Sequence, residues 1–479
     1  MSTPLKKILF NFEKLVLLLT LILLGFIELQ VIKNIWTVYQ SPWIVGVFLP
    51  VLVAFPVFFI LRKRSSTGPI PYLLAIIGVF LALRIYWMWL VPTQLFSDFE
   101  TYDRLARFFQ GGSALKAHLS WRYYLYGFGY PLVLSIWYSI VGNSLFLAKV
   151  FNLLLGLASL LVFYRLGSME DQRLGLTAAF LFTIWPAQWS YTNNIASEHL
   201  ALLLFILALL VFFRFSRSGY PIIDGVILGI ILSAAYVTRG PLIIVLMVTL
   251  GFLLISPLPS KKKMIRMGVI LLGFSGFIIA YFIFMNQVYG IPAKTQGYST
   301  LLMGTNFESK GMWNVEDGNA YQSFDTFEKA NQYALTEAIR RIESAPKKFL
   351  HLMVEKITIT WERDSYGVYW SAYQFEDNPS SKLQSFSIPI ANAASDIFHF
   401  YLILLAMINV SEEIRRPLIS TQVIFLALIL LSGTFLHTIF EAQSRYHYWM
   451  EGILIFLAGL ALWQIARGRV IADPLSAAA

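Results

Sequence analysis

The chain has 479 residues, of which 57% are hydrophobic and only 13% are charged. A soluble globular domain carries about 25% charged residues, so this composition excludes an ordinary soluble protein and indicates a polytopic membrane protein. The net charge of +10 comes from short basic segments between apolar runs, which favours membrane topology over nucleic-acid binding. Because the sequence contains no cysteine, disulfides, a thiol nucleophile and thiolate metal ligands are excluded.

Twelve apolar runs are long enough to cross a bilayer, since a spanning helix needs about 20 apolar residues. The first run follows Lys6 and Lys7 and lacks a small-residue cleavage site, so we interpret it as a retained span and not a signal peptide. These runs predict an all-α polytopic membrane protein with about twelve transmembrane helices. The expected spans are 15–36, 43–61, 70–91, 144–166, 173–190, 197–214, 222–238, 240–256, 267–287, 386–410, 417–438 and 446–466.

The basic loops set the expected topology. The segment 131–141 is only about half as long as a span, so we expect it to be interfacial or re-entrant. The strongly basic short loops, such as Arg62-Lys63-Arg64 and Arg415-Arg416, then all fall on one side, which the positive-inside rule identifies as cytoplasmic. Both termini are predicted to be cytoplasmic in a plasma membrane, most simply a bacterial one, with the functional face outside.

This topology divides the chain into four parts. They are two N-terminal helices (1–61), a transmembrane core (62–287) with a first extracytoplasmic loop (92–143), a second extracytoplasmic loop (288–385), and C-terminal helices with a cytoplasmic tail (386–479). In the second loop, Phe324–Ile342 has helical spacing of apolar residues. Lys347–Trp361 has a basic start and a strong apolar face, which is typical of a helix lying along a membrane surface.

Two carboxylates follow the third predicted span directly. Asp98 and Glu100 lie in a short predicted helix that begins near Ser97, a plausible N-cap, and includes Tyr102. A carboxylate at this position could act as a base on an acceptor hydroxyl near a lipid-bound substrate. The alternative is that either carboxylate only favours the first turn of the helix.

Several basic residues near the same face could hold a phosphate, because a guanidinium can bind phosphate oxygens with two hydrogen bonds. The candidates are Arg122 and Lys116 in the first loop, Arg239 between two spans, and Arg445 before the last span. Arg239 is placed outward, against the charge rule, and a snorkelling arginine at the interface is its alternative.

Other polar residues are expected to contact a substrate headgroup: Glu198, which could also cap its helix, and the residues His437, Glu441 and Tyr446. His437, Glu441 and His447 are metal-ligand types, but their spacing matches no compact site, so no metal site is predicted there. No cofactor is required by these patterns, although the Asp98–Glu100 pair could bind a divalent cation weakly.

Four local motifs together resemble the polytopic GT-C glycosyltransferases, most closely the branch containing protein O-mannosyltransferases and bacterial aminoarabinose transferases. The segment from Gly304 to Asn314 is similar to the second loop of bacterial members. The motifs are Ser97-Asp98-Phe99-x-x-Tyr102-x-x-Leu105-Ala106, Ser197-Glu198 after Trp185-Pro186, Thr238-Arg239-Gly240-Pro241, and Gln443-Ser444-Arg445-Tyr446.

The resemblance implies an inverting transferase that uses a polyprenyl-phosphate-linked sugar as donor. By the same resemblance the first-loop acid is Asp98, with Glu100 as the rival, and the donor phosphate is held by Arg239 and Arg445. The acceptor, a glycan, lipid or protein hydroxyl, is left open. We expect these side chains to converge on one pocket at the outer rim of the bilayer.

Two other functions share the same features. A transporter or flippase for a lipid-linked sugar would also need phosphate-binding arginines, but the chain lacks convincing repeated halves and its polar residues gather at one face. A polymerase or ligase that uses a pyrophosphate-linked donor would call for more cationic contacts. The one-sided polar residues favour the transferase.

Overall fold

The computed structural model describes residues 3–39, 68–111, 127–217, 221–291, 297–375 and 379–467, and within these ranges every regular element is a helix. The all-α prediction is therefore confirmed for this part of the chain. The expected span 43–61 and the candidate residues Lys116 and Arg122 lie outside the described residues.

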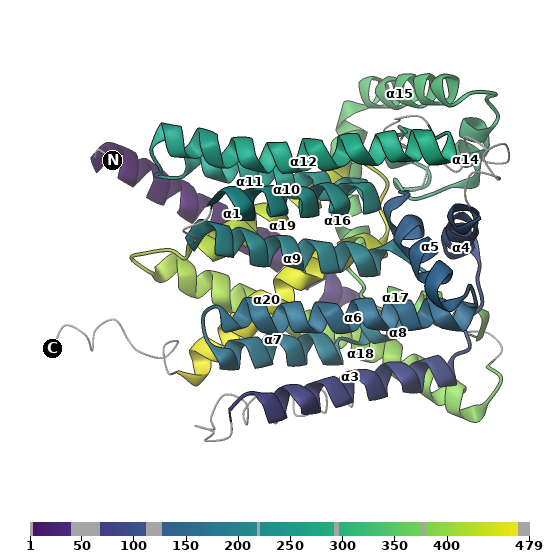
Figure 1. The fold of residues 1–479 in the computed structure, drawn as a ribbon, viewed down its shortest axis with the longest axis horizontal. Helices are drawn as coiled ribbons and strands as arrows, with labels where there is room; N and C mark the ends of the chain where they lie inside the picture. Colours follow the sequence, from purple (N-terminus) through teal and green to yellow (C-terminus); the bar gives the residue numbers. More distant parts are fainter. Residues whose placement is uncertain are drawn as a thin grey trace.

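Nine helices in the described ranges are long and apolar enough to cross a membrane. They run side by side along one direction, and the start of α1 and the end of α20 lie at the same end of the bundle (Figure 1). This arrangement is compatible with the predicted topology. The nine are α1 (Thr3–Val38), α3 (Ile70–Leu90), α6 (Leu145–Ser168), α9 (Ser197–Arg217), α10 (Pro221–Thr238), α12 (Ser260–Tyr289), α18 (Lys382–Arg415), α19 (Thr421–Ile439) and α20 (Tyr448–Ala466), the last extended by the preceding turn.

Two expected spans differ from continuous long helices. The run 173–190 is divided into α7 (Gln172–Ile184) and α8 (Pro186–Tyr191) at Trp185, because Pro186 lacks an amide hydrogen and disfavours a helical conformation in the residue before it. The run 240–256 becomes the short 3-10 turn η3 (Gly240–Leu242) and α11 (Ile243–Ile255). The count of twelve spans stays a prediction.

Burial differs strongly between the helices. In α20 78% of the most apolar window is buried, against 11% in α12, so α20 forms the centre of the bundle and α12 lies at its edge. The edge helix α12 still approaches α10 closely at two glycines. A Cβ atom added at Gly229 would lie 2.1 Å from the carbonyl oxygen of Ile270, and a Cβ atom added at Gly273 would lie 2.2 Å from the carbonyl oxygen of Val226. Small residues allow such close packing of membrane helices.

The other end of the bundle, opposite the start of α1, carries the two predicted loops (Figure 1). The segment 131–141 forms the short helix α5, and the two segments singled out in the second loop become α15 and α16. Residues Leu350 and Val354 of α16 are exposed, and its placement along a membrane surface stays a prediction. The elements here are α4 (Ser97–Gln110), α5 (Gly129–Val141), α13 (Ser299–Gly304), α14 (Val315–Gln322), α15 (Phe327–Ser344), α16 (Pro346–Trp361), α17 (Tyr366–Ala372), η4 (Tyr373–Phe375) and, between α19 and α20, η5 (Ser444–His447).

Candidate functional site

Two carboxylates and two arginines meet where α4, α9, η3 and η5 come together. We call Asp98, Glu198, Arg239 and Arg445 the arginine cluster. Arg445 Nη2 contacts Asp98 Oδ2. Glu198 Oε1 lies 2.7 Å from Arg239 Nη1 and 3.9 Å from Arg445 Nε. Only Asp98 is substantially open, with 28% of its side chain exposed, so the cluster is closed on the bundle side and accessible from the Asp98 side.

The backbone before Asp98 has an unusual conformation. The cap position of α4 is Phe96, not the predicted Ser97, and it makes no side-chain cap hydrogen bond. Ser97 instead has a φ of 53°, in the left-handed region that L residues adopt at an energetic cost. The helix begins where it was expected, but a strained turn, and not a serine cap, directs the Asp98 carboxylate towards Arg445.

Glu100 lies apart from the cluster, although it is only two residues from Asp98. Its Oε1 is 2.5 Å from Arg104 Nη2 on the next turn of α4, and 43% of the Glu100 side chain is exposed. An exposed pair of this kind contributes little to stability and holds its carboxylate in solvent. Of the two candidate acids, the structure brings only Asp98 to the arginines.

A hydroxyl pair joins α4 to the start of α9. The hydroxyl groups of Tyr102 and Ser197 lie 3.1 Å apart, and Arg239 Nη1 donates to Ser197 Oγ at 3.3 Å. Burial, and then the nearby Glu198 carboxylate, raise the pKa of Tyr102, so its hydroxyl stays protonated. For Arg239, burial alone would lower the pKa of the guanidinium, but Glu198 and other neighbours reverse this and raise it. Both groups keep fixed protonation states at neutral pH.

Aromatic rings surround the guanidinium groups. The guanidinium carbon of Arg445 lies 5.3 Å from the ring centre of Trp370 and 5.9 Å from that of Tyr446, and the one of Arg239 lies 5.3 Å from the Tyr446 ring. Such cation–π contacts fix the cations without neutralising them. Tyr446 thus joins the two arginines, while Trp370 on α17 is a neighbour that the sequence motifs did not indicate.

His437 and Glu441 contact the segment that carries Arg445 and Tyr446. The rings of His437 and Tyr446 are 5.3 Å apart, and Glu441 Oε1 accepts a hydrogen bond of 2.5 Å from Gln443. Burial raises the pKa of the Glu441 carboxyl, although the Gln443 hydrogen bond opposes this. Both side chains are buried and support the segment that carries Arg445.

Next to this segment, Lys356 of α16 is a buried cation with no carboxylate partner among the described residues. Its Nζ donates to the carbonyl oxygens of Gly304 at 2.7 Å and Phe440 at 3.0 Å. Burial lowers the pKa of Lys356 to about 7. These bonds tie the second loop to the turn between α19 and η5.

His447 belongs to a different group of residues from the one its sequence neighbours suggested. Asp364, His399, His447 and Glu451 each offer one ligand atom, and these atoms all lie within 4.8 Å of one another. We call this buried set the histidine cluster. Among the described residues, this set has the residue types and the spacing that could hold a metal ion. The signal that could have found it is Glu451, a carboxylate inside an apolar run, where such groups need a partner or a function.

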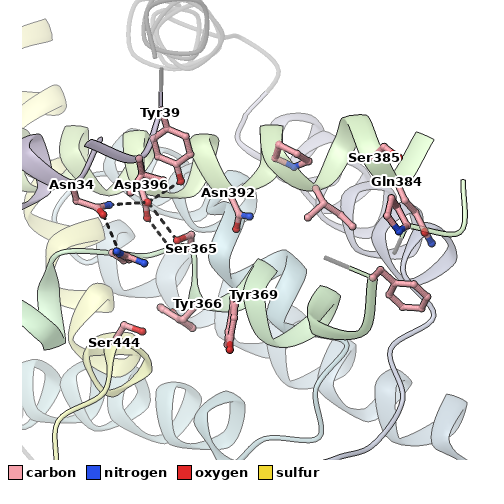
Figure 2. Close-up of a pocket in the computed structure, with 16 residues that line it drawn as sticks. Asn34, Tyr39, Ser365, Tyr366, Tyr369, Gln384, Ser385, Asn392, Asp396 and Ser444 are labelled. Atoms are coloured by element: carbon pink, nitrogen blue, oxygen red, sulfur yellow. Dashed lines mark hydrogen bonds between the residues drawn. The ribbon is translucent and has the colours of Figure 1, made fainter. Parts of the chain in front are cut away.

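A cavity of ≈ 710 Å³ lies between the end of α1, α17 and α18, and it reaches Ser444, the residue before Arg445. Figure 2 shows Asn34, Tyr39 and Ser365 gathered around Asp396 at one end of it. Asp396 accepts hydrogen bonds of 2.9 Å from the Tyr39 hydroxyl and 3.1 Å from Asn34. The cavity therefore has a polar end, and its lining includes Ser444 from the segment that carries Arg445. Its volume is typical of sites for small ligands.

Residues 127–283 match the family model described as dolichyl-phosphate-mannose-protein mannosyltransferase. The matched range begins just before α5 and ends within α12. It contains Glu198 and Arg239 but neither Asp98 nor Arg445. None of the curated proteins matches the sequence significantly.

Among solved structures, the chain is similar to crystal structures of the Archaeoglobus fulgidus oligosaccharyltransferase. The apo form has a TM-score of 0.49 at 15% identity, covering 83% of this chain and 50% of that one. The form tethered by a disulfide to an acceptor peptide containing the NVT sequon has a TM-score of 0.45 at 13% identity, covering 83% of this chain and 49% of that one. The chain thus spans about half the length of these structures.

Proposed function

We propose that this chain, a membrane glycosyltransferase of the GT-C superfamily, transfers a sugar from a polyprenyl-phosphate donor to an acceptor hydroxyl at the extracytoplasmic face. The superfamily is supported by the match of residues 127–283 to the mannosyltransferase family model and by the helical membrane bundle. The donor class, inversion at the anomeric carbon and the role of Asp98 as the base are the further parts of the proposal.

The observation that carries the proposal is the contact between Asp98 and Arg445 beside the Arg239–Glu198 pair. It joins a partly open carboxylate to two guanidinium groups. In the reaction, the acceptor oxygen attacks the anomeric carbon while Asp98 takes its proton. The bond from the anomeric carbon to the phosphate oxygen breaks, and its electron pair leaves with the polyprenyl phosphate.

The arginines would stabilise the negative charge that develops on the leaving phosphate. Asp98 is paired with Arg445, and a carboxylate engaged with this guanidinium is not placed to contact an acceptor hydroxyl. We infer that the donor phosphate takes over Arg445 and thereby frees Asp98 to accept a proton. Base activation would then depend on donor binding.

Glu198 would determine how much positive charge the two arginines present to the donor phosphate. It lies 2.7 Å from Arg239 Nη1 and is almost fully buried, so it fixes the orientation of this arginine in the absence of substrate. The cavity that reaches Ser444, the residue before Arg445, would supply a volume in which a sugar or an acceptor group could lie. Its polar and aromatic lining, including Tyr366 and Tyr369, suits a carbohydrate.

The test is transfer by the purified protein in lipid, supplied with a polyprenyl-phosphate sugar and a panel of acceptors. Asp98→Asn removes the base while it keeps the side-chain shape, and we expect turnover to fall about 10²–10⁴-fold with donor binding retained. Glu100→Gln is the matched control on the same helix and should leave turnover within about twofold, because its carboxylate lies in solvent beside Arg104.

Arg239→Ala should instead weaken donor binding, measured directly by titration with the labelled donor. Equal turnover in wild type and Asp98→Asn would contradict the base assignment, and unchanged donor affinity in Arg239→Ala would contradict the phosphate role. Movement of the donor between leaflets without any glycosylated product would favour a flippase.

A further inference from the structure

We propose that the histidine cluster, Asp364, His399, His447 and Glu451, binds a divalent metal ion of the zinc type in a closed structural site. The proposal goes beyond the transfer reaction, and the site is separate from the arginine cluster. All four side chains are buried, and their ligand atoms lie within 4.8 Å of one another. They come from three helical elements and one loop, so an ion here would join parts of the chain that are distant in sequence.

Each of the two histidines bonds a backbone carbonyl through one ring nitrogen, which leaves the opposite nitrogen available as a metal ligand. His399 Nε2 lies 3.0 Å from the carbonyl oxygen of Trp361, and His447 Nδ1 lies 2.6 Å from that of Thr360. A carbonyl only accepts, so these nitrogens carry the hydrogens and a neutral ring keeps its lone pair on the opposite nitrogen. Histidines that bind metals usually donate their second N–H to such a carbonyl.

The two free nitrogens each face a carboxylate oxygen. His399 Nδ1 lies 3.0 Å from Glu451 Oε1, and His447 Nε2 lies 3.1 Å from Asp364 Oδ1. If both rings are neutral, each of these nitrogens directs its lone pair at a carboxylate oxygen. Because both atoms of such a pair are acceptors, a proton or a cation must lie between them. A divalent ion would satisfy both pairs at once.

The charges favour a cation. Each ion pair that Asp364 and Glu451 make in the described part of the chain is with a histidine, and none is with a lysine or an arginine. Two buried carboxylates without a cation are costly. A second observation that points to a bound cation is Glu451 Oε2. This atom is fully buried without a hydrogen-bond partner and lies 4.0 Å from His447 Nε2. A divalent ion would balance the two negative charges and occupy this unpaired oxygen.

The donor set and its spacing suit zinc. Zinc binds histidine nitrogen and carboxylate oxygen at about 2.0–2.2 Å with tetrahedral geometry, so neighbouring ligand atoms lie about 3.3 Å apart. The nitrogen–oxygen distances of 3.0 and 3.1 Å are close to this value. Four protein ligands leave no open position, which is the pattern of a structural site. A set of two imidazoles and two carboxylates with no sulfur also fits manganese or iron, but these ions prefer more ligands.

Neighbouring groups hold the ligands in place. Trp185 Nε1 donates to the second oxygen of Asp364 at 2.7 Å, and the ring of Trp361 stacks on that of His447 with centres 5.0 Å apart. The site would clamp the loop between α16 and α17 to α18 and α20. Because His447 is only two residues from Arg445, the clamp would also fix the segment that carries the proposed phosphate-binding arginine.

The experiment measures bound metal and not activity. The full chain is purified in detergent through a tag without histidine, incubated with zinc sulfate, desalted and analysed by elemental mass spectrometry. We expect about one zinc per chain. Glu451→Gln and His399→Gln should each lower metal affinity at least tenfold. The matched control is His351→Ala, since His351 is an exposed histidine on α16 and should leave the affinity unchanged.

A second measurement uses only the wild-type protein, in case the variants do not fold. Removal of the metal with a chelator should lower the midpoint of thermal unfolding, and zinc should restore it. Loading with cobalt should give the visible absorption of a tetrahedral site. Less than about a tenth of a zinc per chain, with no effect of zinc on unfolding, would overturn the proposal and leave a proton-bridged network. An unchanged metal content in folded Glu451→Gln would also overturn it.

Discussion

The arginine cluster and the histidine cluster share one short segment, because Arg445 and His447 are both in η5. Each contains two carboxylates, but the carboxylates have different partners. Asp98 and Glu198 meet guanidinium groups, whereas Asp364 and Glu451 meet only imidazoles. The first set is therefore neutral as it stands, and the second needs protons or an ion.

Exposure separates the two clusters further. The Asp98 side chain is 28% exposed, while the side chains of the histidine cluster are fully buried. A cluster that is open on one side can exchange its internal ion pairs for a substrate phosphate. A fully buried cluster has no such open side for a substrate. Thus one turn of the chain would supply both a binding group and the support that fixes it.

The largest effect should come from breaking the arginine cluster. Arg445→Gln leaves Asp98 and the buried Glu198 with fewer positive charges, and loss of one partner of a buried pair costs about 3–5 kcal/mol. Unfolding by denaturant in mixed micelles measures this change. The control is Arg104→Gln, whose exposed partner Glu100 should make the change smaller than about 1 kcal/mol. Similar losses in the two variants would show that the cluster is not a buried ion-pair network.

A smaller effect is expected at the edge of the histidine cluster. Trp185→Phe keeps most of the ring but removes the hydrogen bond to Asp364. It leaves a buried carboxylate oxygen unpaired, so the protein should lose about 1–3 kcal/mol. The same denaturant titration measures it. Trp89→Phe, at an exposed position on α3, should stay within about 0.5 kcal/mol. A loss at Trp185 no larger than that at Trp89 would show that the hydrogen bond to Asp364 contributes little to stability.

A pH dependence of stability is expected at a third kind of group, the buried Lys356, which has no carboxylate partner among the described residues. Burial lowers the pKa of Lys356 to about 7, whereas a lysine in the unfolded chain titrates near 10.4. Between these pH values the unfolded chain binds more protons, so stability should rise with pH by up to about 1.4 kcal/mol per unit. Unfolding midpoints at about pH 7.5 and 9.5 measure this rise. Lys356→Met should flatten it, and an unchanged slope in the variant would contradict the assignment.

The membrane fold was readable from the sequence because long apolar runs report directly on spanning helices. Two predicted spans, 173–190 and 240–256, are not single long helices, and each contains a proline (Pro186 and Pro241). Hydropathy does not report where a proline interrupts a helix. The short segment 131–141 was separated from the spans by length alone. Its short helix α5 agrees with that interpretation.

The arginine cluster could be anticipated because each member lies in a local motif at the same predicted face. The choice between Asp98 and Glu100 could not be made, since it depends on the direction in which one turn of α4 presents its side chains. The histidine cluster was missed for a different reason. His399 and Glu451 are 52 residues apart, and neither lies in a motif, so only the packing of α18 against α20 reveals their pairing.

The left-handed backbone at Ser97 has a consequence for any effort to make this protein more robust. A glycine there would relax the turn and increase the melting temperature of the substrate-free protein, by removing about 1–2 kcal/mol of strain. It would also loosen the residue that follows. Screens for thermal stability would therefore select, at this position, a change that loosens Asp98, the carboxylate proposed as the base.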